Sequence, residues 1–219
     1  MIGGLGVGAT IYDYENLSRG CERLGFALDI VIIHAQTPRV FEYVEAKNRV
    51  GLAEYLNGYI RRMKAAGAEM AAIPAITPLF CSKELAEASA LPIVSLIDPL
   101  IRELQARKAR RVAIFGTRFV IESDLFEALS GVEVVRPGAG EVDTIHKTYV
   151  DLASTGDASA EKHEKLTAFA YHLVSRHAVD TILLAGTDLT LLFNESNTDF
   201  PHVDCAALHV REILRVITG

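Results

Sequence analysis

Short apolar segments alternate with amphipathic segments along most of this 219-residue chain. Segments rich in β-branched residues predict strands at 28–34, 69–74, 92–97, 111–116, 132–136 and 180–185. Apolar side chains recurring every three or four residues predict helices at 48–66, 82–90, 99–108, 122–130, 160–178 and 204–217. A helix between two strands returns the chain to the same edge, so the strands run parallel. The order predicts an α/β protein with parallel sheets flanked by helices.

The pattern starts again in the second half of the chain. One strand–turn unit, residues 69–79, lies in the first half, and two others, 111–117 and 180–188, lie in the second. No linker rich in Pro, Gly or Ser separates the halves. We therefore expect two related, tightly joined halves that face each other across a cleft.

Composition excludes several classes of protein. The net charge of −6 and the pI near 5.7 leave no basic stripe for nucleic acid. The three cysteines form no CxxC pair, which favours a reducing compartment. The first residues, MIGGLGVGAT, lack the basic and long apolar regions of a signal peptide, and no apolar stretch approaches the ~20 residues of a membrane span. We expect a cytoplasmic protein without a membrane partner.

Ligands of parallel sheets bind beyond the carboxyl ends of the strands, so the turns that follow strands are the candidate site. These turns are Gly3–Thr10, Thr37–Arg39, Ala75–Leu79, Gly116–Thr117 and Ala185–Asp188. The first is rich in glycine, but only Met1 and Ile2 precede it and no Lys-Ser/Thr pair follows. It therefore fits neither a dinucleotide fingerprint nor a P-loop. It fits a close approach to a small ligand and, equally, a tight turn between a strand and a helix.

Several polar residues of these turns suit a carboxylate ligand. Arg39 could hold a carboxylate through two hydrogen bonds, or it could be a solvated surface residue. The turns at 75–79 and 185–188 lead into helices whose first N–H groups favour an anion. Asp188 could serve there as an acid or base, or simply as a helix N-cap.

Other kinds of site are not indicated. The seven histidines are scattered without an HExxH motif or a paired His/Cys spacing, so no metal site is predicted. The GxSxG motif of a serine nucleophile is absent.

Five segments, in order, carry a resemblance to a known family. They are Gly3-Gly4-Leu5-Gly6 with Ala9-Thr10, Pro74-Ala75-Ile76-Thr77, Gly116-Thr117 with Glu122-Ser123, Ala185-Gly186-Thr187-Asp188, and Asp204 with His209. Over about residues 2–210 the chain resembles the aspartate/glutamate racemase family, whose members work without pyridoxal phosphate.

The resemblance implies two Rossmann-like lobes, which here would be residues 1–97 with 205–219 and residues 98–204. It also implies a homodimer that needs no cofactor, and a small acidic carboxylate or dicarboxylate as ligand. The ligand-contacting residues implied by the match are Gly6, Thr10, Arg39, Ile76, Thr77, Thr117, Gly186 and Thr187.

The chain departs from this family at its two catalytic positions. Two cysteines normally exchange protons with opposite faces of the substrate α-carbon, and here Ala75 and Gly186 stand in their places. Neither side chain carries a proton, so racemisation by two cysteines is not available. Asp188 is the best remaining base, whereas Cys81 lies on the following helix and is expected to be a buried structural residue.

Two functions therefore remain open. The first is an isomerase or lyase with an altered acid–base set, in which Asp188 acts on a small acidic carboxylate. The alternative is a non-catalytic homologue that binds a carboxylate as a sensor or regulator.

Overall fold

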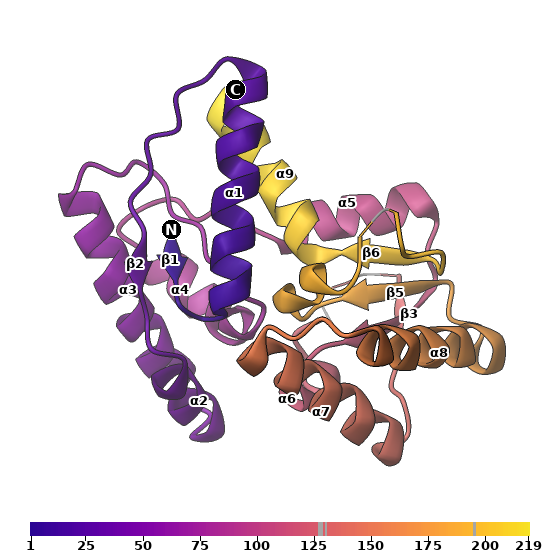
Figure 1. Cartoon of the computed structure of the whole chain (residues 1–219). Coiled ribbons are helices and arrows are strands. Elements are labelled where there is room, and N and C mark those ends of the chain that lie inside the picture. The colour runs from indigo at the N-terminus through magenta and orange to yellow at the C-terminus, as the bar shows by residue number, and fades with distance from the viewer. Residues whose placement is uncertain (127–128, 130, 195) are drawn as a thin grey trace. The chain divides into compact units, whose positions relative to one another are not determined.

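The computed structural model describes residues 1–126, 129, 131–194 and 196–219. These residues form two compact units, which are described separately (Figure 1). Unit 1 comprises Met1–Ser95 and His209–Gly219, and unit 2 comprises Leu96–Leu208. Each contains parallel strands with helices packed around them, as the alternating pattern predicts. No helix in the described part of the chain is long and apolar enough to cross a membrane.

Unit 2 is built on a four-stranded parallel sheet in the order β4-β3-β5-β6. The strands are β3 (Arg111–Phe115), β4 (Glu133–Val135), β5 (Thr181–Leu184) and β6 (His202–Asp204). All four residues of β5 are buried, as a central strand of a parallel sheet requires. In the register, Val112 pairs with Thr181 and Phe115 with Leu184, so β3 and β5 end together.

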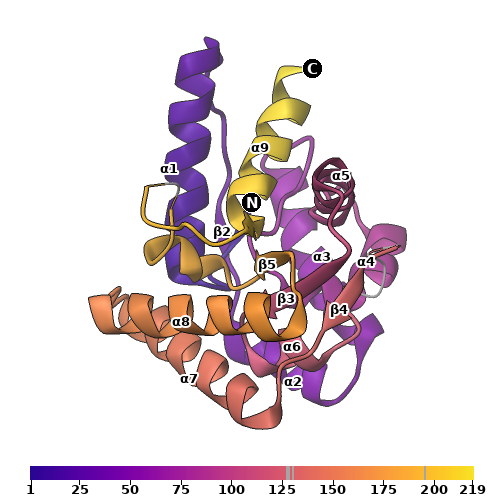
Figure 2. The same ribbon diagram turned by 90° about the vertical axis from the view of Figure 1, so that its right-hand side faces the viewer.

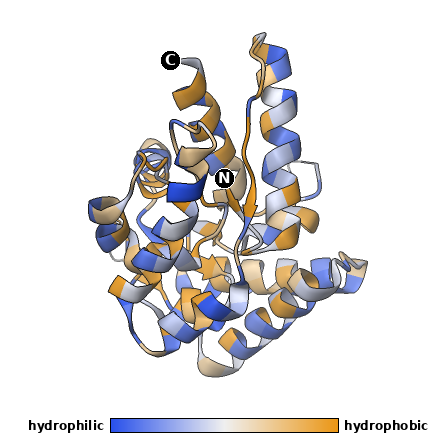
Figure 3. Ribbon diagram, turned by 90° about the vertical axis from the view of Figure 1, so that its left-hand side faces the viewer, coloured by the Kyte–Doolittle hydropathy of each residue, from blue (hydrophilic) through white to orange (hydrophobic). Residues whose placement is uncertain are grey.

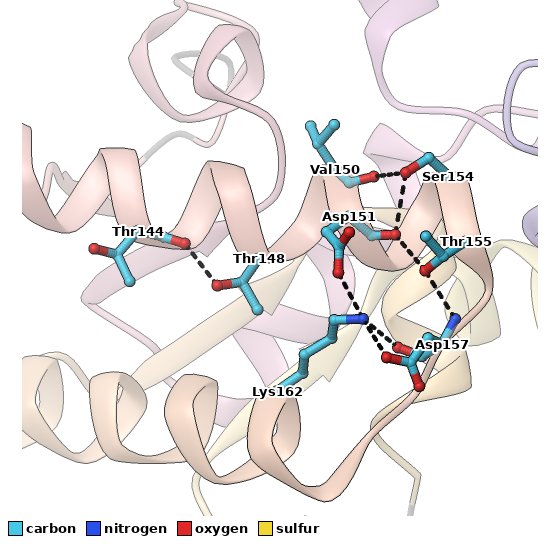
Figure 4. Close-up of polar contacts among 8 residues, drawn as sticks. All are labelled: Thr144, Thr148, Val150, Asp151, Ser154, Thr155, Asp157 and Lys162. Carbon is cyan, nitrogen blue, oxygen red and sulfur yellow. Dashed lines mark hydrogen bonds and ion pairs between the residues drawn. The ribbon is translucent and has the colours of Figure 1, made fainter.

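Helices cover both faces of this sheet. Figure 2 shows α5 on one face and α7 with α8 on the other. Their bounds, with those of the shorter helices of unit 2, are α5 (Ile97–Arg107), α6 (Arg118–Glu122), α7 (Ala139–Thr155), α8 (Ala160–His177) and the 3-10 helix η2 (Thr187–Leu191). The antiparallel pair α7–α8 is joined at its connecting turn by Lys162, whose Nζ lies 2.7 Å from the carboxylates of Asp151 and Asp157 (Figure 4).

Unit 1 has a shorter sheet and more helix. The strands β1 (Ile2–Gly3) and β2 (Ile33–His34) pair in parallel. The helices are α1 (Val7–Leu24), α2 (Thr37–Glu45), α3 (Arg49–Ala65), the 3-10 helix η1 (Thr77–Cys81), α4 (Ser82–Ala88) and most of α9 (Cys205–Thr218). Leu17, Ala72, Val94 and Ile213 form part of the buried cluster between α1, α9 and the extended segments.

Three predicted strands of unit 1 are much shorter than expected. Of residues 28–34 only Ile33–His34 form a strand, and residues 69–74 and 92–97 contribute a single bridge between Ala71 and Ile93. The segment before β2 is nevertheless hydrophobic along most of its length, as its orange colour shows (Figure 3).

A hollow in unit 1 lies beside these short strands. It has a volume of about 530 Å³ and is lined on one side by residues 27–31 and on the other by residues 66–70. Between these two segments, Ile2 N–H donates to the carbonyl of Ala72, and Ile33 N–H donates to the carbonyl of Met1. Because β1 covers only two residues, the segments on either side of it face this hollow instead of a longer central strand.

Most predicted helices are present within one or two residues of their expected bounds. One prediction is wrong in part: α6 ends at Glu122, and Ser123–Phe126 form bends and turns instead of the start of a helix over 122–130. Residues 127, 128 and 130 of that prediction lie outside the described residues. Helices α1, α2 and α7 were not predicted, and neither was strand β6.

We expect Gly58→Ala to stabilise unit 1 by about 0.5–1 kcal/mol, because glycine inside a helix carries an entropic cost relative to alanine. Gly58 lies within α3, and a Cβ there would meet no atom within 4 Å. Urea unfolding followed by circular dichroism measures the change. Gly4→Ala is the comparison variant, for which we expect the opposite result. Gly4 has φ +85°, and a Cβ there would lie 2.5 Å from the carbonyl oxygen of Ala35, so this variant should be less stable than the unmodified protein.

Candidate functional site

The glycine-rich turn between β1 and α1 uses its own polar groups internally. Gly4 N–H donates to Thr10 Oγ1 over 3.0 Å, and the Thr10 hydroxyl donates to the carbonyl of Gly6 over 2.8 Å. Gly6 is the residue before α1, with φ 148°. The hydroxyl of Thr10 was expected to contact a ligand. In the structure its two hydrogen bonds stabilise the conformation of the turn.

The turn after β2 lies against this one. Thr37 Oγ1 donates to the carbonyl of Gly4 over 2.8 Å, which brings the start of α2 to the carboxyl edge of β1. Arg39, two residues further, has its Nη1 2.6 Å from Glu42 Oε2, and its guanidinium lies 5.7 Å from the centre of the Tyr43 ring. The Arg39 side chain is about half exposed. Since exposed ion pairs contribute little, the bond to Glu42 is a weak competitor for a carboxylate ligand.

The turn at Ala75, to which the resemblance assigns the first family cysteine, leads into a short helix. Ala75 is partly exposed, its N–H donates to the carbonyl of Ile73, and Ile76 is buried before η1 begins at Thr77. Cys81, at the end of η1, is fully buried and its thiol donates to the carbonyl of Pro78. Burial raises the pKa of the Cys81 thiol to about 12, so it is a structural residue and no substitute for a proton-exchanging thiol.

In unit 2, the turns after β3 and β5 lie side by side. Ala185 N–H donates to the carbonyl of Phe115 over 2.9 Å, and a Cβ on Gly116 would lie 3.3 Å from the carbonyl oxygen of Ala185. Thr117 follows directly and caps α6, with its Oγ1 accepting from Val120 N–H. The structure thus brings the predicted residues of 116–117 and 185–188 together at one edge of the sheet.

The ring of Tyr149, from α7, occupies the space beside Gly186. A Cβ on Gly186 would lie 2.3 Å from one ring carbon of Tyr149 and 2.7 Å from two others, closer than such atoms approach in proteins. Glycine at position 186 is therefore what permits the ring to lie here. The resemblance assigns the second family cysteine to position 186, and here the ring of Tyr149 occupies the space that a side chain would fill.

The same tyrosine is bonded to Asp188. Its hydroxyl donates to Asp188 Oδ2 over 3.1 Å, and the two side chains are buried, with Asp188 2% and Tyr149 8% exposed. Burial first, and then the charge of Asp188, raise the pKa of Tyr149 far above its usual range. The phenol therefore keeps its proton and acts as a donor to the carboxylate. Thr187, also buried, lies next to this pair.

The sequence contains a periodic pattern that indicates burial of Tyr149, although Tyr149 belongs to none of the family motifs. Val142, Ile145, Tyr149 and Leu152 recur every three or four residues and are the buried face of α7. A helix over this stretch would have predicted Tyr149 to point inward, although not toward Gly186.

The final matched pair, Asp204 and His209, has structural roles. Asp204 Oδ1 accepts from the N–H groups of Ala206 and Ala207 and so caps the start of α9. His209 is buried, with its Nε2 3.2 Å from the carbonyl oxygen of Val94, and burial lowers its pKa.

Comparison with known proteins gives a consistent result. The sequence profile of the family Asp/Glu/Hydantoin racemase matches residues 2–213. The broad specificity amino-acid racemase RacX of Bacillus subtilis (strain 168) is 24% identical over 224 residues, which cover 94% of this chain and 92% of RacX.

Solved structures share the fold. An aspartate racemase homologue from Pyrococcus horikoshii OT3 superposes with a TM-score of 0.80 at 22% identity, covering 100% of this chain and 97% of that one. A glutamate racemase from Francisella tularensis in complex with D-glutamate superposes with a TM-score of 0.66 at 14% identity, covering 99% and 80%. The profile match spans nearly the whole sequence, and the chain therefore belongs to the Asp/Glu/hydantoin racemase family.

Proposed function

We propose that this protein acts on a small acidic carboxylate as an isomerase or lyase in which the Tyr149–Asp188 pair replaces the second family cysteine. The observation that carries the proposal is the placement of Tyr149. Its ring fills the space of the side chain missing at Gly186, and its hydroxyl is bonded to Asp188. The proposal thus replaces the family's thiol with an acid–base group formed by Tyr149 and Asp188.

The choice of ligand rests on the family. The relatives are amino-acid racemases, and one solved structure holds D-glutamate. Within unit 2, Thr117 and Thr187, which follow β3 and β5, are the residues proposed to hold a carboxylate. Arg39 of unit 1 is a separate candidate for carboxylate contact, as the resemblance implies. We include in the proposal a cofactor-free homodimer in the cytoplasm, as the family implies, and sedimentation of the purified protein tests the dimer.

The chemistry follows from having an acid–base group on one face only. Ala75, to which the resemblance gives the other cysteine position, carries no transferable proton. Asp188 as base takes the α-proton, and the electron pair left on carbon is stabilised as the enediolate of the adjacent carboxylate. Proton abstraction is the step that an isomerase and a lyase share. With an amino acid that has no leaving group, the same group returns a proton to the same face, so the configuration is retained. The proposal thus predicts exchange of the α-hydrogen with solvent without racemisation.

A second candidate, a carboxylate-binding homologue without catalysis, is favoured by one observation. Asp188 and Tyr149 are 2% and 8% exposed, so the pair has little contact with the surface. In that case the pair is a structural filling of the vacated cysteine position, and the turns bind a ligand for a sensing or regulatory role.

We expect the protein to incorporate deuterium at the α-carbon of at least one acidic amino acid in D₂O, with retention of configuration. The measurement combines proton NMR with chiral chromatography on L- and D-aspartate, L- and D-glutamate and small diacids. Racemisation at the same rate as exchange would contradict the one-face mechanism. Stabilisation of the protein by one of these ligands in a thermal unfolding assay, with no exchange, would contradict the enzyme and support the binding protein.

A further inference from the structure

Three side chains with metal-binding groups meet in unit 2, away from the turns described above. Glu141 lies in the first turn of α7, and His172 and His177 lie in the last turns of α8. One ligand atom from each lies within 4.8 Å of the ligand atoms of the other two. None of these residues takes part in the proposed function.

The neighbouring groups orient this cluster. Glu141 Oε2 accepts from Gly138 N–H over 2.7 Å, which leaves Oε1 directed at His172 Nε2, 3.0 Å away. The rings of His172 and His177 have their centres 6.1 Å apart and are inclined at 61°. The carbonyl of His177 accepts from Arg111 Nε, which ties the end of α8 to β3. The hydrogen bond from Gly138 N–H to Glu141 resembles the outer-shell hydrogen bonds that orient metal ligands.

We propose that Glu141, His172 and His177 bind a divalent transition metal, with Zn²⁺ as the probe ion. Two imidazole nitrogens and a carboxylate oxygen are ligands that Zn²⁺ prefers, at distances of about 2.0–2.2 Å. Tetrahedral coordination places such atoms roughly 3.3 Å apart. The partly exposed side chains of His172 (38%) and Glu141 (24%) reach that spacing by small rotations. A water molecule completes the coordination.

The position of the site indicates a structural role. His177 comes shortly before the amino end of β5. Gly186 and Asp188 come after the carboxyl end of the same strand, so the two sites are at opposite ends of β5. The α7–α8 pair is already fastened at its connecting turn by Lys162 (Figure 4). A metal on Glu141, His172 and His177 would fasten the opposite end of the same pair, and would stabilise unit 2 without entering the reaction.

Sequence reasoning predicted no metal site, and the reason is spacing. His172 and His177 are five residues apart and Glu141 lies on another helix, so no recognised local motif is formed. Only the packing of α7 against α8 brings them together.

Calorimetric titration with Zn²⁺ at pH 7.5 is expected to show one strong site per chain, and saturating Zn²⁺ is expected to raise Tm by at least about 3 °C. His172→Ala and His177→Ala should each weaken binding by at least about 10-fold. Glu141→Gln should weaken it too while keeping an oxygen for the Gly138 N–H, so its effect is separate from helix capping.

His163→Ala is the matched control, because His163 lies on the same helix with its Nε2 3.1 Å from the carbonyl oxygen of Asn197. This variant should bind Zn²⁺ as the unmodified protein does. The proposal is overturned if Zn²⁺ does not bind, or if the three variants of Glu141, His172 and His177 bind it with the unmodified affinity. It is also overturned if His163→Ala loses binding to the same degree as His172→Ala.

Discussion

Replacing Asp188 by asparagine is expected to lower the rate of α-hydrogen exchange by about 10²–10⁴-fold, the usual contribution of a positioned general base. Asparagine has nearly the same shape as aspartate, and its amide oxygen can still accept from the Tyr149 hydroxyl that lies 3.1 Å from Asp188 Oδ2. The substitution therefore removes the basic group and keeps the packing. The measurement is deuterium incorporation by NMR, with circular dichroism to establish that the variant is folded.

Two further variants separate the base from its surroundings. Tyr149→Phe keeps the ring beside Gly186 and removes only the hydroxyl, so Tyr149 as a positioning residue predicts a smaller loss, of about 10-fold, and an unchanged Km. Asp199→Asn changes an exposed aspartate of the same unit and should leave exchange intact. A folded Asp188→Asn protein that exchanges at the unmodified rate would remove Asp188 from the mechanism.

The sequence predicted unit 2 better than unit 1, for a physical reason. Strands β3 and β5 pair with each other over four residues, and each has a second partner strand, β4 or β6, over three residues, so the apolar runs at 111–116 and 180–185 became strands. The run at 28–34 is just as apolar, yet most of it forms no strand, because its neighbour β1 has only two residues. Strand formation depends on the partner, and periodicity describes one segment at a time.

The motifs predicted positions for the candidate site but not the contacts at those positions. The resemblance assigns the cysteine positions to residues 75 and 186 and leaves residue 188 as an acid, and these assignments remain predictions. The hydroxyl of Thr10 and the guanidinium of Arg39 were expected to face a ligand, and each has a partner within its own turn or helix. Such local partners are set by backbone geometry, which a motif of residue types does not specify.

The relation between Tyr149 and Gly186 is the clearest case of information that the sequence lacks. Nothing in the spacing of these residues links them, since they meet only through the packing of α7 against the end of β5. A glycine at a catalytic position reads as a simple loss. In the structure, the absence of a side chain at Gly186 leaves the space that the ring of Tyr149 occupies.

Gly186→Ala is expected to destabilise the protein by about 1–3 kcal/mol, the usual effect of inserting atoms into a packed interior. The added Cβ would lie 2.3 Å from the Tyr149 ring, so the ring must move and its hydrogen bond to Asp188 lengthens or breaks. For a chain of this size, each kcal/mol lowers Tm by roughly 2–4 °C, which thermal unfolding measures. Gly140→Ala is the control, because a Cβ at this position of α7 meets no atom within 4 Å.

A double-mutant cycle tests whether Tyr149 is the cause. In a Tyr149→Leu background the ring is gone, so Gly186→Ala should cost less than about 1 kcal/mol, and the coupling between the two changes should be about 1–2 kcal/mol. Equal costs in the two backgrounds would show that the ring does not fill this space. If the coupling is found, restoring a cysteine at position 186 also requires removing the ring at 149.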